Sequence, residues 1–225
     1  MTNVFEASAL IIPVLLAITL HEAAHGYVAD FLGDDTARRM GRISLNPLRH
    51  VDPFGTVLLP ALLFLANAPF LFGYAKPVPV NFRRLNNPRR DMVLVAAAGP
   101  GINLGLALAS AVLFHGVEFP SNGVQAWLWT ALTYSVYFNV LLAVFNMLPL
   151  PPLDGGRVAV GLLPDRLAFP LARLERHGIL IVIGAIFLLP WLGQAIGVRL
   201  DVFQWLVAAP AQAVMRAILA VAGVN

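Results

Sequence analysis

The sequence contains no cysteine. Disulfide bonds and thiolate metal ligands are therefore both excluded, and any bound metal has to be held by histidine and carboxylate side chains. Charged residues are also scarce, at 12% of 225 residues, against about a quarter in soluble domains. Hydrophobic residues make up 59% of the chain, and its mean hydropathy is +0.77. This composition predicts an integral membrane protein.

Other features are missing as well. No hydrophilic block is long enough for a second domain, so residues 1–225 are interpreted as one membrane-embedded domain. The N-terminus lacks a basic region and a small-residue cleavage site, so we expect its first apolar segment to be a retained span. The sequence pI is near 9.8, but no basic patch is interleaved with aromatic residues, which argues against a nucleic-acid partner.

Six segments are apolar enough to be considered as membrane spans. Each approaches the ~20 residues that a helix needs to cross a bilayer. The sequence therefore predicts an all-α polytopic membrane protein. The segments are 7–29, 54–73, 92–114, 127–149, 178–197 and 203–223.

Basic residues are concentrated in three of the loops between these segments. Residues 30–53, 74–91 and 150–177 hold four, five and four of the fifteen lysines and arginines. Because basic loops stay in the cytoplasm, all three are placed there and the N-terminus outside. The segment 54–73 then begins and ends on the same side, which predicts about five transmembrane helices plus one re-entrant or interfacial segment. An ordinary kinked span with one basic loop outside is the alternative.

The first apolar segment ends in a His-Glu-x-x-His pattern. Residues four apart lie one above the other on a helix, so His21 and His25 can offer imidazole nitrogens to one metal ion. Glu22 stands beside them, within reach of a metal-bound water. Ionisable groups at membrane depth are costly and are functional candidates for that reason. The alternative is a helix end whose histidines have only a structural role.

A third metal ligand is needed, because catalytic zinc is usually held by three protein ligands. Asp154 is the strongest candidate. Prolines at 149, 151 and 152 should end the preceding helix, and Gly155 and Gly156 should let the chain turn and aim the carboxylate inward. His50 and Asp52 precede Pro53 in a turn and are left out of the site.

These residues resemble the three signatures of site-2 proteases, which are zinc metalloproteases that cleave inside membranes. The signatures are His21-Glu22-x-x-His25, Gly99-Pro100-x-x-Asn103 and Asn146-x-x-Pro149 leading to Leu153-Asp154-Gly155. The connection 115–126 is too short for a PDZ domain, so the chain resembles a compact prokaryotic member.

The resemblance implies one zinc ion (Zn2+) per chain, with His21, His25 and Asp154 as metal ligands. It implies catalytic roles for Glu22 as general base and then acid, and for Asn146 as a donor to the developing oxyanion. Asn103 and a further asparagine, Asn139, are expected to join helices by hydrogen bonds.

The implied function is an intramembrane zinc endopeptidase of a prokaryotic cell membrane, with its active site near the cytoplasmic side. The implied partners are the lipid bilayer and transmembrane protein or peptide substrates, and the oligomeric state is open. Residues 41–47 alternate polar and apolar side chains, which predicts a short β-like membrane-associated loop that pairs with an unwound substrate, with 76–81 lining the same entrance. Ordinary interfacial loops are the alternative for both segments. The alternatives are a membrane metal-binding or transport protein and an inactive scaffold of the same fold.

Overall fold

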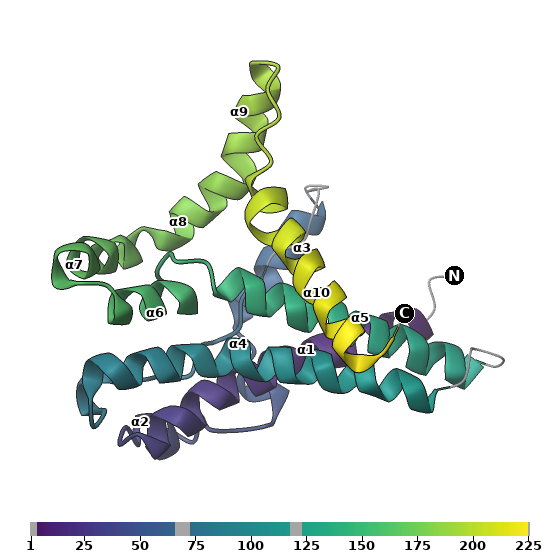
Figure 1. Ribbon diagram of the computed structural model, residues 1–225, viewed down its shortest axis with the longest axis horizontal. Helices are drawn as coiled ribbons and strands as arrows, with labels where there is room; N and C mark the ends of the chain where they lie inside the picture. Colours follow the sequence, from purple (N-terminus) through teal and green to yellow (C-terminus); the bar gives the residue numbers. More distant parts are fainter. Residues whose placement is uncertain (1–3, 66–72, 118–122, 225) are drawn as a thin grey trace.

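The structure is a computed structural model that describes residues 4–65, 73–117 and 123–224 (Figure 1). Its described part is built from helices, and no β-strand occurs in it. The α-helices are α1 (Val4–Phe31), α2 (Thr36–Arg39), α3 (Leu59–Leu65), α4 (Pro88–Leu113), α5 (Gly123–Asn146), α6 (Asp154–Leu162), α7 (Asp165–Arg173), α8 (Gly178–Ile183), α9 (Leu189–Ala195) and α10 (Ala209–Ala222).

Five helical segments in the described residues are long and apolar enough to cross a membrane, which confirms the all-α polytopic fold. Three of them are α1, α4 with its following turn, and α5. The fourth runs from α8 through a π-helical stretch into α9, and the fifth joins a similar stretch to α10. Large apolar side chains such as Ile11, Leu16 and Leu113 are exposed along these helices, as lipid-facing side chains are.

Helices α1, α4 and α5 pack against one another and form the centre of the molecule (Figure 1). On α1, every fourth residue from Ala9 to Ala29 is buried, and on α4 every fourth residue from Asp91 to Ala111. Residues at this spacing form one continuous row along a helix, and small residues in such rows let helices approach closely in a membrane. The buried residues of the two rows are Ala9, Pro13, Ala17, His21, His25 and Ala29 on α1, and Asp91, Val95, Gly99, Asn103, Ala107 and Ala111 on α4.

The C-terminal third of the chain is arranged around this centre. Helix α6 packs against α4, and α7 follows it. Helices α8 and α9 leave the centre as an arm, and α10 returns to pack against α4 and α5 (Figure 1).

The loop after α1 is fastened by a buried carboxylate. Asp34 is fully buried and accepts hydrogen bonds from the backbone N–H groups of Thr36, at 3.1 Å, and Asn81, at 2.6 Å. The second bond holds the end of the extended segment 74–81 against the C-terminal end of α1. We call residues 74–81 the strap.

The two ends of the segment 54–73 meet in space. Tyr74 N–H donates to the Gly55 carbonyl at 3.0 Å, and Thr56 Oγ1 donates to the Tyr74 carbonyl at 2.8 Å. Between them lie a π-helical stretch, Pro53–Leu58, and α3, while residues 66–72 lie outside the described part. A chain that returns to its starting point agrees with the predicted re-entrant segment.

The β-like character predicted for 41–47 is limited to irregular backbone, since neither 41–47 nor the strap forms a β-ladder in the described residues. Pro77 and Pro79 explain this for the strap, because a proline has no N–H to donate to a neighbouring strand.

Because the two ends of the segment 54–73 meet, the residues that flank this segment should lie on the same side of the membrane. Single cysteines replacing Leu48 and Arg83, both exposed, should react with an impermeant thiol reagent from the same side of the membrane. The sequence has no cysteine of its own, so there is no background. A cysteine replacing exposed Gly116 between α4 and α5 is the control for the opposite side. Opposite-side labelling of the first two positions would show an ordinary span.

Candidate metal centre

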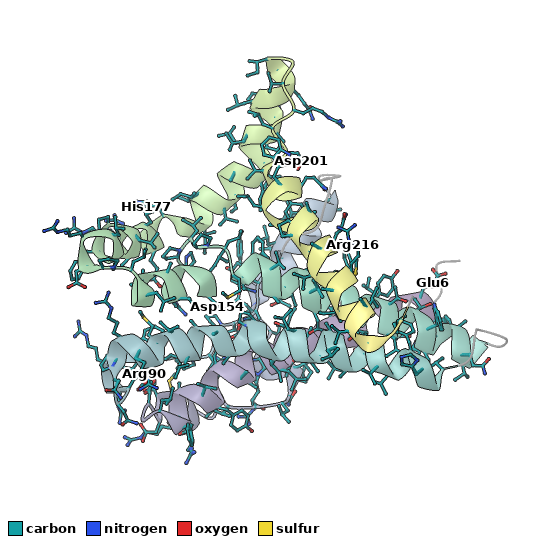
Figure 2. The ribbon with its side chains drawn as sticks, viewed as in Figure 1. Glu6, Arg90, Asp154, His177, Asp201 and Arg216 are labelled. Carbon is teal, nitrogen blue, oxygen red and sulfur yellow. The ribbon has the colours of Figure 1, made fainter. Side chains whose placement is uncertain are left out.

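Two histidines of α1 face the packed centre of the molecule. His21 is 7% exposed and His25 is 9% exposed, and both belong to the buried row of α1. Asp154, at 6% exposure, is the first residue of α6 and lies beside α4 (Figure 2). The structure thus brings together all three residues that the sequence analysis assigned to a metal site.

The three side chains converge on one point. His21 Nε2 lies 3.1 Å from His25 Nε2, and Asp154 Oδ2 lies 3.1 Å from the first nitrogen and 3.3 Å from the second. These donor atoms are within 4.8 Å of one another and are buried, so they form a group able to hold a metal ion. Within the described residues, no other group of histidine and carboxylate side chains does so.

The hydrogen bonds behind the imidazoles decide which nitrogens face this point. His25 Nδ1 lies 2.7 Å from the Val95 carbonyl oxygen, which can only accept, so Nδ1 carries the proton. His21 Nδ1 lies 2.6 Å from Asn103 Oδ1, which also accepts. Both Nε2 atoms therefore turn lone pairs toward each other and toward Asp154 Oδ2.

This arrangement passes a physical test for a metal ion. Three electron-rich atoms about 3 Å apart repel one another unless a cation lies among them. Asp154 Oδ2 is buried and has no hydrogen-bond partner among the described residues, which is costly for a carboxylate unless a cation compensates it. Two imidazole nitrogens and one carboxylate oxygen are a ligand set that zinc accepts.

The neighbouring histidines also determine the charge of Asp154. Burial by itself would raise the pKa of this carboxyl, but a proton shared between the imidazole pair and Asp154 outweighs burial and brings the pKa below its usual range, and a bound metal ion would take the place of that proton. The group is therefore ionised at neutral pH, which is the form that binds a metal.

The loop before α6 positions Asp154 by close packing. Helix α5 ends at Asn146, and the proline-rich stretch that follows leads to Asp154, as predicted. Gly155 and Gly156 do not make the predicted sharp turn, because both lie inside α6. A β-carbon at position 155 would collide with the Met147 carbonyl, and one at position 156 with Pro151. The glycines are needed for this close approach, which folds α6 back onto its own loop.

A third glycine controls the distance between α4 and the histidines. A β-carbon at position 99 would lie 2.5 Å from His25 Nε2 and 2.6 Å from His21 Nε2. These distances are shorter than any normal contact, so only glycine lets the α4 backbone approach the imidazole pair this closely. Gly99 belongs to the Gly-Pro-x-x-Asn signature, and its role here is steric.

Glu22 stands next to this group and is held by the strap. Its Oε2 accepts a hydrogen bond from the Val78 N–H at 2.8 Å. Val78 and Ile43 also lie 3.1 Å from the position of a β-carbon on Gly26, so both predicted entrance segments touch α1 beside Glu22. Glu22 Oε1 has no hydrogen-bond partner among the described residues.

The other predicted residues have local partners. Asn146, the last residue of α5, donates to the Leu142 carbonyl at 3.0 Å, so its oxyanion role stays a prediction. His50 Nε2 lies 2.8 Å from the Ser44 carbonyl oxygen, and Asp52 accepts the N–H groups of Phe54 and Gly55. Neither His50 nor Asp52 belongs to the metal-ligand group, as expected.

Sequence reasoning missed two supports of the histidines. The Val95 carbonyl carries no sequence signal, because every residue has one. Asn103 does carry a signal, since it follows Gly99 by four residues and therefore shares its face of α4, next to the histidine row. The expected helix-joining role of Asn103 is only part of its function in the structure.

The family follows from comparison with known proteins. The family described as "Peptidase family M50" matches residues 9–190 of this chain, which is more than half of it. The chain belongs to the site-2 protease family. The resemblance drawn from the signatures is confirmed, and the nine residues 114–122 between α4 and α5 leave no room for an inserted domain there.

Three curated relatives illustrate the similarity. The chain is 41% identical over 182 residues to "Putative zinc metalloprotease YwhC" of Bacillus subtilis, covering 76% of this chain and 77% of that protein. It is 29% identical over 170 residues to "Putative zinc metalloprotease Rip2" of Mycolicibacterium smegmatis, covering 75% of this chain and 62% of that one. With the Mycobacterium tuberculosis Rip2 the identity is 31% over 141 residues, covering 63% and 52%. No solved structure matches the chain.

The close approach at Gly99 gives a prediction for this site-2 protease. Gly99→Ala should weaken metal binding, because its methyl group must push α4 away from the histidines. Overpacking of this kind costs about 1–3 kcal/mol, which corresponds to roughly 5- to 150-fold in metal affinity. The measurement is metal content and affinity of the purified protein by chelator competition.

Gly101→Ala and Gly105→Ala are matched controls on the same helix. No atom of the described structure outside the helix lies within 4 Å of a β-carbon at either position. Both variants should bind metal like the unaltered protein. Unchanged metal affinity in Gly99→Ala would show that metal binding does not depend on the close approach of the α4 backbone to the histidines.

Proposed function

We propose that this protein is an intramembrane zinc endopeptidase that hydrolyses peptide bonds within or near transmembrane segments of its substrates. The observation that supports this most is the convergence of His21, His25 and Asp154 beside Glu22, on a helix apolar enough to span a membrane. The zinc metalloprotease names of the relatives support the same activity.

His21, His25 and Asp154 would hold one zinc ion per chain. When bound there, zinc supplies Lewis-acid chemistry, polarising a carbonyl and making water acidic enough to act as a nucleophile near neutral pH. The three side chains would supply two neutral nitrogens and one negative oxygen. Three protein ligands are the number that catalytic zinc sites commonly use.

Glu22 would act as the proton carrier. The Val78 N–H fixes one of its oxygens, and the other is available to accept a proton from the attacking water. The same carboxyl would then deliver the proton to the nitrogen of the leaving amine. Asn146 would donate its amide to the developing oxyanion, because it ends α5 just before the loop that carries Asp154.

The substrate class follows from where these groups lie. A transmembrane substrate has to unwind before its peptide bonds are accessible. Irregular backbone at 41–47 and the strap borders Glu22, and we propose that this region receives the unwound segment. The three basic loops support a cytoplasmic position for this end of α1, and we propose that the membrane is the cell membrane of a prokaryote.

The buried charges argue against a transport path. The buried ionisable side chains of the described residues are His21, His25, Asp34, His50, Asp91 and Asp154. Among the five spans, α5 and the two that follow it contain none of these. An ion path across the membrane needs such groups at several depths. The intact Glu22 argues against an inactive scaffold.

Glu22→Gln should retain zinc and lose cleavage. Glutamine has nearly the same volume and keeps an acceptor for the Val78 N–H, so the helix and the metal ligands should be unaffected. Only the proton carrier is removed, which is worth about 10²–10⁴ in rate. The measurement is cleavage of a panel of transmembrane peptides in detergent or bilayers, together with zinc content.

His21→Ala should behave differently and lose zinc and activity together. Near-normal cleavage by Glu22→Gln would show that another group carries the proton. No peptide products from the unaltered protein, with metal flux that Glu22→Gln changes, would favour transport.

A further inference from the structure

A chain of buried amide and hydroxyl groups leads from His21 across three helices. Asn103 of α4 is fully buried, and Asn139 of α5 is 1% exposed. Asn103 Nδ2 donates to Asn139 Oδ1 at 2.7 Å, and Asn139 Nδ2 donates to the Ser135 carbonyl at 2.9 Å. We call His21, Asn103, Asn139 and Ser135 the amide relay.

The donors and acceptors of the relay permit only one orientation of the Asn103 and Asn139 side-chain amides. Ser135 and Ala17 offer carbonyl oxygens that can only accept, and they take N–H groups from Asn139 and Asn103 respectively, the second at 3.2 Å. Asn139 must therefore turn its oxygen to Asn103, and Asn103 must turn its oxygen to His21. The orientation of each amide is fixed by its neighbours.

We propose that Asn103 is a positioning residue for the metal site and that Asn139 is the residue that orients it. The Asn103 oxygen holds the His21 proton on Nδ1, so that Nε2 presents its lone pair to the metal. A histidine ligand is commonly oriented by such an acceptor behind it, whose removal costs about 10- to 100-fold in metal affinity. This proposal rests on the proposed metal site but not on the protease reaction.

The two histidines differ in the group that accepts the hydrogen bond from Nδ1. His25 is held by the Val95 carbonyl, a backbone group that no side-chain substitution removes. His21 depends on a side chain, which in turn depends on a second side chain from another helix. Helix α5 also ends at the loop that carries Asp154, so one helix supports two of the three ligands.

The test compares Asn103→Leu with Asn103→Asp. Leucine has a similar size but no acceptor, whereas aspartate keeps an oxygen facing His21. Asn103→Leu should bind zinc about 10- to 100-fold more weakly. Asn103→Asp should lose less affinity, because it keeps the acceptor for His21 although it no longer donates to Asn139 and Ala17. Zinc affinity is measured by chelator competition on the full chain in detergent, and the visible spectrum of the cobalt-substituted protein reports the ligand geometry.

Two further variants complete the series. Asn139→Leu should weaken zinc binding less than Asn103→Leu, because the Ala17 carbonyl still holds the Asn103 amide. Ser110→Ala is the control, since Ser110 touches the end of the chain of groups only through the Ser135 hydroxyl, at 2.7 Å. It should leave zinc affinity unchanged. If Asn103→Leu does not fold, the ranking of Asn103→Asp, Asn139→Leu and Ser110→Ala still tests the proposal.

A merely structural role gives another pattern. If Asn103→Asp lost as much zinc affinity as Asn103→Leu, or if a folded Asn103→Leu kept full affinity, the positioning role would be wrong. If Asn139→Leu and Ser110→Ala had equal effects on zinc affinity, Asn139 would not be the residue that orients Asn103. If the predicted ranking held but no peptide were cleaved, the relay would stand and the proposed protease activity would fail.

Discussion

The structure depends on the close antiparallel approach of α1 and α4. Rows of buried residues at every fourth position let the two backbones come together, and the histidines stand in one of these rows. In a membrane, lipid is as apolar as leucine, so tight packing of small residues and hydrogen bonds between helices hold the bundle. At Gly99 the approach is closest, and there the α4 backbone lies against the imidazole pair.

This contact explains why the metal site and the fold cannot be separated. The same helix that packs on α1 supplies the Val95 carbonyl and the Asn103 amide, which orient the two histidines. Helix α5 packs on both, orients Asn103, and ends at the loop that delivers Asp154. Polar groups at this depth are expensive without partners, and here each imidazole has one behind it. The bundle therefore holds the three candidate ligands in place.

In the chemistry proposed for this site-2 protease, helices hold the metal ligands, and irregular segments contact the substrate. The ligands come from long helices and from the first turn of α6, where packing fixes them. Glu22 is on the same rigid helix, but its contact is with the strap, a segment without regular secondary structure. The strap is hydrogen-bonded at one end to the stretch Pro53–Leu58 and at the other end to Asp34. An unwound substrate needs backbone that is not part of a helix to lie against, and in a helical membrane protein such backbone occurs only where protein covers it.

Much of this was determined by the sequence alone. Hydrophobic segments of span length predicted the helices, and His21, Glu22, His25 and Asp154 were identified as candidates because helical spacing and proline breaks are local properties of the chain. The two glycines after Asp154 were interpreted wrongly as a turn, since a close approach of backbone to backbone is not visible in a linear pattern. Only the tertiary structure decided that Asn103 orients His21, that Gly99 controls the distance to the imidazoles, and that Val78 holds Glu22. These contacts join residues between 56 and 82 positions apart, and their geometry is set by how the helices pack.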